Sequence, residues 1–115
     1  MERIAVIDFE TTGISPSSSC RATEIAVVIL EQGRIVERYQ SLMNAGVRVP
    51  GFIEQLTGIS NAMLRSAPSA EQVMNSLTSF ITCSADGALR SMALLIPVSC
   101  SIKPGTRTPA FIRLW

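Results

Sequence analysis

The amino-acid sequence predicts an α/β fold in which a three-stranded antiparallel meander is followed by helices. Two observations support this prediction. The first 43 residues contain apolar, β-branched segments separated by short turns, which is typical of paired strands. After Pro50, apolar residues recur with the helical period of about 3.6 residues. A chain of 115 residues is long enough for one domain with a hydrophobic core.

Strands are predicted where β-branched and other apolar residues dominate, over residues 3–8, 24–30 and 35–43. A serine-rich loop, 13–19, separates the first strand from the second. A turn at 31–34 separates the second strand from the third, and its Gly33 can take a positive φ. Because both connections are short, the three strands are expected to pair as an antiparallel meander.

Two helices are predicted after the strands. A short helix over Gly51–Thr57 begins after Pro50 and ends before Gly58. Its apolar side consists of Phe52, Ile53 and Leu56. The sequence Ser-Ala-Glu-Gln at 69–72 resembles a capping box that opens a helix over 70–81. Its apolar stripe consists of Val73, Leu77, Phe80 and Ile81. Both apolar sides are expected to pack on the sheet.

The chain changes character near Thr82. Residues 1–82 hold eight acids and six arginines, a net charge of −2, whereas residues 83–115 hold one acid, three arginines and one lysine, a net charge of +3. Residues 92–98 can begin a strand, but Pro97 excludes a central position in a sheet because it donates no hydrogen bond. We therefore divide the chain into a partial domain, 1–82, and an atypical tail, 83–115.

The composition argues against several kinds of protein. No apolar run approaches the roughly 18 residues of a membrane span, and the first residues do not form a signal peptide, so we expect a cytoplasmic protein without a membrane partner. Cys20, Cys83 and Cys100 lack the spacing of a disulfide framework or a zinc site. Histidine, the commonest general base, is absent.

Two carboxylates stand at the end of the first predicted strand, in the segment IAVIDFETTG. In an extended strand, residues i and i+2 point to the same face, so Asp8 and Glu10 project together. Their like charges raise each other's pKa unless a cation lies between them. Because oxygen ligands favour hard ions, the pair predicts a site for Mg²⁺ or Mn²⁺. The alternative is a solvated strand end whose acids have no role.

Four sequence features occur in an order that is characteristic of a known family. The first strand ends in DFETTG, the second contains EIAVV, the short helix ends in LTGIS, and the next helix opens with SAEQ. Together, over about residues 3–82, they resemble the DEDD 3′-to-5′ exonucleases, specifically the proofreading epsilon subunit of bacterial DNA polymerase III and its relatives.

This resemblance implies the amino-terminal part of a ribonuclease-H-like exonuclease fold, with an incomplete site for two Mg²⁺ or Mn²⁺ ions. Asp8 and Glu10 would be metal ligands and catalytic residues, with Asp8 bridging the ions. In two-metal hydrolysis one ion activates water and the other stabilises the departing 3′ oxygen. The residues implied to bind the terminal nucleotide of the substrate are Thr11, Thr12, Gly13 and Thr57.

The second half of that site is not recognisable in the sequence. In the family, a strand with the pattern Val-Ala-His-Asn-Ala-x-Phe-Asp supplies a further metal ligand, whereas residues 88–97 of this chain read ALRSMALLIP. Asp86 is the only acid after Glu71, and the family's late histidine base has no counterpart. We hypothesise that the chain from about residue 83 is a truncated or frameshifted reading of an exonuclease gene, which the gene's nucleotide sequence would test.

Three functions remain open. The first is a 3′-to-5′ exonuclease-family protein that hydrolyses phosphodiester bonds of nucleic acid with two metal ions. This chain alone would be weak or inactive, because a general base raises the reaction rate by about 10²- to 10⁴-fold. The second is a non-catalytic remnant that binds nucleic acid or a polymerase. The third is a truncated gene product without a selected function. The partners expected for the first are the 3′ end of single-stranded DNA and a DNA polymerase.

Overall fold

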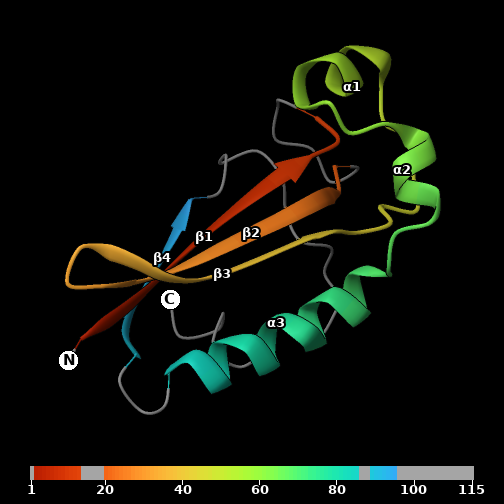
Figure 1. Ribbon diagram of the computed structural model, residues 1–115. Helices are drawn as coiled ribbons and strands as arrows, with labels where there is room; N and C mark the ends of the chain where they lie inside the picture. Colours follow the sequence, from red (N-terminus) through yellow and green to blue (C-terminus); the bar gives the residue numbers. More distant parts are fainter. Residues whose placement is uncertain (1, 14–19, 86–88, 96–115) are drawn as a thin grey trace.

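A mixed sheet with the strand order β3-β2-β1-β4 forms the centre of the molecule, and helix α3 crosses one of its faces (Figure 1). The computed structural model describes residues 2–13, 20–85 and 89–95. The elements, in chain order, are β1 (Arg3–Thr11), β2 (Ala22–Glu31), β3 (Arg34–Leu42), α1 (Gly51–Thr57), α2 (Asn61–Arg65), α3 (Ala70–Ala85) and β4 (Leu89–Leu95). Parts of the predicted loop and of the predicted tail, 14–19 and 96–115, lie outside the described residues.

The first three strands form the predicted antiparallel meander, in which β2 pairs with both β1 and β3. A two-residue turn connects β2 to β3, with Glu31 and Arg34 paired on either side of it. Its central residues, Gln32 and Gly33, have φ values of 51° and 73°. Positive φ at both positions is typical of a type I′ turn, whose twist matches that of paired strands. The positive φ predicted for Gly33 is therefore confirmed.

β4 lies beside β1 and runs parallel to it, with Asp8 opposite Leu95. The sequence indicates a strand only from Met92, whereas β4 begins three residues earlier because it pairs with the edge that β1 offers. Within the described part of the chain, β4 is an edge strand and ends two residues before Pro97. Pro97 itself, which is expected to take no central position in a sheet, lies outside the described residues.

The main hydrophobic core lies between α3 and the face of the sheet that α3 covers. It contains Ala5, Ile7, Phe9, Ile25, Val27 and Ile29 from the sheet, and Val73, Leu77 and Ile81 from α3. The predicted apolar stripe of α3 is confirmed, and its Phe80 packs on Tyr39 with ring centroids 5.4 Å apart. Because alternate residues of β1 are buried here, the residues between them project from the opposite face of the sheet.

Helix α3 is held at both ends. At its start, Gln72 N–H donates to Ser69 Oγ at 3.2 Å and Ser69 N–H donates to Gln72 Oε1 at 3.0 Å, which confirms the predicted capping box. The helix continues to Ala85, four residues beyond its predicted end. Near that end, the Arg3 guanidinium donates to the carbonyl of Ser84 and so links the start of β1 to α3.

Helices α1 and α2 enclose a second, smaller core, which consists of Val49, Ile53, Ile59 and Leu64. The prediction that the apolar side of α1 packs on the sheet is wrong, because Ile53 is buried in this second core instead. Phe52 and Leu56 are 57% and 71% exposed. α2 was not predicted, since five residues are too few to show a period. Its N-cap is Ser60, whose Oγ accepts from Met63 N–H at 3.1 Å. None of the described helices is long and apolar enough to span a membrane.

Candidate active site

Asp8 and Glu10 lie on the face of β1 that is opposite the main core. Asp8 is exposed and Glu10 is partly exposed. The buried residues that alternate with them are Ala5, Ile7 and Phe9. β1 continues past its predicted end at Asp8 because its last residues pair with β2. Both carboxylates therefore belong to the strand itself and share one face, as their spacing predicts.

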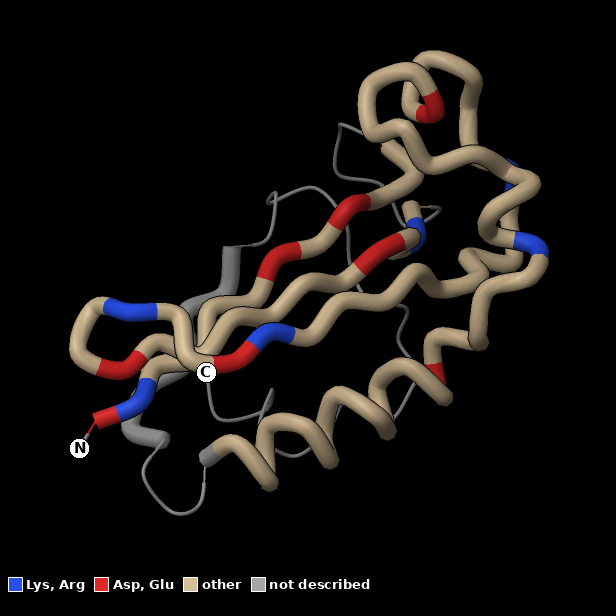
Figure 2. The backbone as a smooth tube through the Cα atoms, in the orientation of Figure 1, with Lys and Arg blue, Asp and Glu red and all other residues tan. Residues whose placement is uncertain are grey.

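A third carboxylate joins this face from β2. Glu24 is paired with Glu10, and Ala26 is paired with Asp8. Paired residues of antiparallel strands point to the same face, so Glu24 lies beside Glu10. Figure 2 shows the acidic positions, in red, on the adjacent strands β1 and β2. Sequence reasoning missed Glu24, because the pairing register that brings the EIAVV strand against DFETTG is not visible in either segment alone.

Negative charge accumulates on this face. Burial raises the pKa of Glu10 above its ordinary value of 4.5, and the neighbouring charges of Asp8 and Glu24 raise it further. Asp8 Oδ1 accepts a hydrogen bond of 2.9 Å from the backbone N–H of Phe9. A cation bound between the carboxylates would relieve their repulsion.

The donor atoms on this face fit a hard divalent cation in part. Carboxylate oxygens are the ligands that Mg²⁺ and Mn²⁺ prefer. Asp8 and Glu10 supply such oxygens from β1, which is paired with β2 and β4. Within the part of the chain that the structure describes, no group of three acidic, histidine or cysteine side chains is placed to hold a metal ion. Asp8 and Glu10 can therefore supply two ligands, and the remaining ligands have to come from elsewhere.

Glu10→Gln should stabilise the metal-free protein at pH 7 by about 0.5 kcal/mol, the scale of one cross-strand pair. Because the folded-state pKa of Glu10 is raised, its protonation favours the folded protein. This contribution is complete below the unfolded-state pKa and is lost as the pH rises through the raised pKa. The gain from Glu10→Gln should therefore be present at about pH 7 and absent below about pH 4.

Urea unfolding of the wild-type and variant proteins across this pH range measures the difference in free energy of unfolding. Glu2→Gln is the matched control, since Glu2 is exposed near the start of the chain, and it should change the free energy of unfolding little at any pH. A gain from Glu10→Gln of equal size at both ends of the range would show that the charge of Glu10 is not its cause.

The segment after the carboxylates is held by its own side chains. Thr11 Oγ1 donates to the carbonyl of Gly13 at 2.9 Å, and Thr12 Oγ1 accepts from Arg21 N–H at 3.0 Å. Both threonines are 7% exposed. A Cβ atom on Gly13 would lie 2.7 Å from Cys20 Sγ, so a larger residue there would force a shift of one of the two. These residues thus shape the end of the strand, and their contact with a terminal nucleotide stays a prediction.

Thr57 is the last residue of α1, on a separate element. Its Oγ1 donates to the carbonyl of Ile53 at 2.8 Å and accepts from Ile59 N–H at 3.2 Å. The helix ends before Gly58, as predicted, and Gly58 has a φ of 74°. Because the hydroxyl hydrogen of Thr57 is used within the chain, its predicted contact with a base or sugar is left to the methyl group and the remaining lone pair.

Residues 5–85 match the model of a family described as Exonuclease, RNase_T. The 3′-5′ exonuclease DinG of Bacillus subtilis is 46% identical over 72 residues, which are 63% of this chain and 8% of DinG. DNA polymerase III subunit epsilon of Aquifex aeolicus is 38% identical over 76 residues, which are 66% of this chain and 37% of that protein. The match thus spans much less than two thirds of the length of either relative.

Solved exonuclease structures share the fold. The nuclease domain of 3′hExo, a DEDDh family member bound to rAMP, gives a TM-score of 0.67 at 21% identity, over 83% of this chain and 51% of that one. Exonuclease X in complex with 5′ overhanging duplex DNA gives a TM-score of 0.57 at 22% identity, over 81% of this chain and 57% of that one. The predicted ribonuclease-H-like exonuclease fold, of which this chain holds the amino-terminal part, is confirmed.

Proposed function

Since this chain belongs to the RNase_T exonuclease family, we propose that it takes part in 3′-to-5′ hydrolysis of nucleic acid and supplies the first two carboxylates of a metal-dependent site. By itself the chain is expected to hydrolyse nucleic acid only slowly. One observation carries the proposal, namely that Asp8 and Glu10 share the face of β1 opposite the core.

The strand gives these carboxylates a fixed geometry. β1 is paired on both sides, with β2 and β4, and its other face is buried against α3. A site needs such rigid support because small errors in ligand position weaken it. Asp8 and Glu10 would hold Mg²⁺ or Mn²⁺, which, when bound, supplies activation of water and charge stabilisation at the scissile phosphate.

The substrate in this proposal is the 3′ end of a single strand of nucleic acid, with DNA favoured. The backbone of Thr11, Thr12 and Gly13 follows directly after the carboxylates, where it can approach a sugar or phosphate. Thr57 contributes a contact from the end of α1. A DNA polymerase is a proposed partner, since a relative is a DNA polymerase III subunit, and the proposed compartment is the cytoplasm.

The residues available beside β1 support the proposal that this chain alone hydrolyses nucleic acid slowly. β4 occupies the neighbouring sheet position and reads LRSMALL, without a carboxylate. Asp86 is the only acid after Glu71, and the chain contains no histidine. Since a general base contributes about 10²- to 10⁴-fold, the carboxylate pair alone is expected to leave turnover slow.

The test is degradation of a single-stranded oligonucleotide labelled at its 5′ end, with Mn²⁺ and then with EDTA. We expect slow, stepwise shortening from the 3′ end, and none in EDTA. Shortening that begins at the 5′ end, or cuts within the strand, would refute the proposed polarity.

A second function is favoured by the absence of a carboxylate in the sequence of β4. In this alternative the chain binds nucleic acid or a polymerase without hydrolysis. Folded protein that binds the labelled strand and leaves it intact in Mn²⁺ would support the alternative over turnover by this chain.

A further inference from the structure

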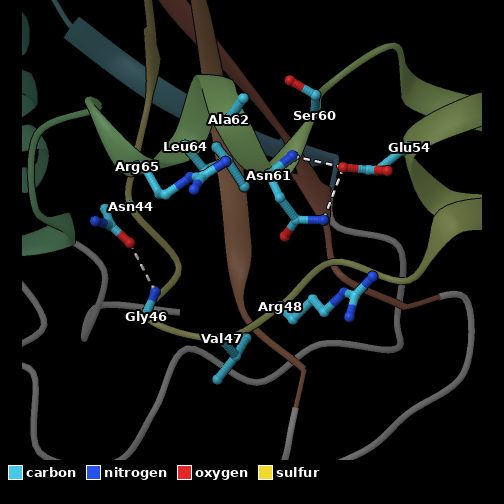
Figure 3. A pocket seen from close by; sticks show the side chains of 10 residues that line it. All are labelled: Asn44, Gly46, Val47, Arg48, Glu54, Ser60, Asn61, Ala62, Leu64 and Arg65. Atoms are coloured by element: carbon cyan, nitrogen blue, oxygen red, sulfur yellow. Dashed lines mark hydrogen bonds between the residues drawn. The ribbon is translucent and has the colours of Figure 1, made fainter.

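A pocket of about 690 Å³ lies between the loop that follows β3 and helix α2 (Figure 3). Its lining comes from residues 44–65, and none of these residues belongs to β1 or β2. The pocket is therefore distinct from the carboxylate face. Its volume falls within the range of about 300–1,000 Å³ that is usual for ligand sites.

Two arginines give this pocket a positive charge. Arg48 comes from the loop after β3, and Arg65 is the last residue of α2. Both side chains are exposed, and within the described part of the chain neither takes part in an ion pair. Figure 3 shows the two side chains reaching the pocket from separate segments, on either side of Asn61 in this view. Two such guanidinium groups are well suited to bind phosphate.

The acid that lines the pocket is already engaged. Glu54 Oε1 accepts hydrogen bonds from Asn61, at 2.6 Å from the backbone N–H and 2.7 Å from Nδ2. Asn61 also donates to the carbonyl of Val49 at 2.9 Å and accepts from its N–H at 2.7 Å. These bonds join the loop, α1 and α2 into one wall. The charged side chains that line the pocket, Arg48, Arg65 and Glu54, carry a net charge of +1.

We propose that this pocket binds backbone phosphates of a single strand of nucleic acid, upstream of the 3′ end that is held at Asp8 and Glu10. The inference rests on the proposed function. Thr57, expected at the terminal nucleotide, and Ser60, which lines the pocket, are three residues apart, so their Cα atoms lie within about 11 Å. Val47, 44% exposed, adds an apolar contact for a sugar or base.

The test compares the wild-type chain with Arg48→Gln plus Arg65→Gln in a binding titration. Fluorescence anisotropy of a 5′-fluorescein-labelled oligothymidylate is measured in EDTA, so that bound metal contributes nothing. We expect the double variant to bind roughly tenfold more weakly at low salt. Its plot of log K against log salt should be less steep by about 1.4, since each single-strand phosphate contact contributes about 0.7.

The matched control is Arg34→Gln plus Arg38→Gln, which removes the same charge from exposed positions of β3. It should change the affinity less than about twofold, and circular dichroism checks that both double variants are folded. The single substitutions Arg48→Gln and Arg65→Gln should each produce about half of the change in slope.

Three outcomes would overturn the pocket proposal. They are equal loss of affinity in the two double variants, wild-type affinity in Arg48→Gln plus Arg65→Gln, and competition by thymidine monophosphate as strong as that by the oligonucleotide, which would make the pocket a mononucleotide site. Failure of the proposed function looks different, because a chain that never hydrolyses the strand in Mn²⁺ can still show the arginine-dependent binding in EDTA.

Discussion

Asp8→Asn combined with Glu10→Gln should weaken Mn²⁺ binding by this chain at least about a hundredfold. The substitutions keep the shape of both side chains but remove the two anionic oxygen ligands that β1 presents on one face. Removal of a residue that only hydrogen-bonds to a metal ligand already weakens metal binding by about 10- to 100-fold. Removal of both ligands themselves should therefore weaken it more. Electron paramagnetic resonance of free Mn²⁺ during a titration measures the affinity directly.

Thermal unfolding provides a second readout of the same binding. At a Mn²⁺ concentration about ten times the Kd of the wild-type chain, the free energy of unfolding of the wild-type chain should rise by about 1.4 kcal/mol. That of the double variant should not change. The matched control is Glu2→Gln plus Glu71→Gln, which removes two exposed negative charges elsewhere. Retained Mn²⁺ binding in the Asp8 and Glu10 variant would mean that other residues hold the ion.

Leu77→Ala should lower the free energy of unfolding by about 3 kcal/mol. Leu77 is fully buried in the core between α3 and the sheet, and truncation of a buried leucine removes apolar contacts and leaves a cavity. Because small domains are stable by only about 5–15 kcal/mol, this is a large fraction of the total. Urea denaturation followed by circular dichroism measures the loss.

Leu56→Ala makes the same chemical change at a position that is 71% exposed on α1. It should alter the free energy of unfolding by less than about 0.5 kcal/mol. Similar losses in the two variants would argue against the packing of α3 on the sheet. That packing also matters for the site, because it buries the face of β1 opposite Asp8 and Glu10.

The carboxylate face illustrates a conflict between stability and function. Glu10 is partly buried beside Asp8 and Glu24, which raises its pKa and disfavours the metal-free folded state at neutral pH. The same accumulation of charge is what a divalent cation needs. A site of this kind is therefore expected to gain stability from the ion that it binds.

Local features of the fold could be predicted from the sequence because their causes lie within a few residues. The positive φ of Gly33 and of Gly58 follows from the freedom of glycine at a turn and at a helix end. The capping box of Ser69 and Gln72 needs only three residues of separation. The shared face of Asp8 and Glu10 follows from the two-residue period of a strand.

Other features could not be predicted because they depend on which segments meet. The burial of α1 is an example, since Ile53 is 2% exposed while Phe52, its neighbour, is 57% exposed. Both are apolar, and the sequence pattern treats them alike. α1 contacts the second core with one narrow side, and the position of that side is set by the loop and by α2 rather than by the helix itself.

The amino-acid sequence was therefore sufficient for the family, the antiparallel meander and the carboxylate pair, since these rest on motifs and short-range periodicity. The folded chain was needed to place Glu24 opposite Glu10, β4 beside β1, and Arg48 and Arg65 around one pocket. Each of these arrangements brings together residues that are distant in the sequence. The register of β1 against β2 and the packing of the helices, which bring such residues together, are set by contacts along whole elements rather than by a motif of a few residues.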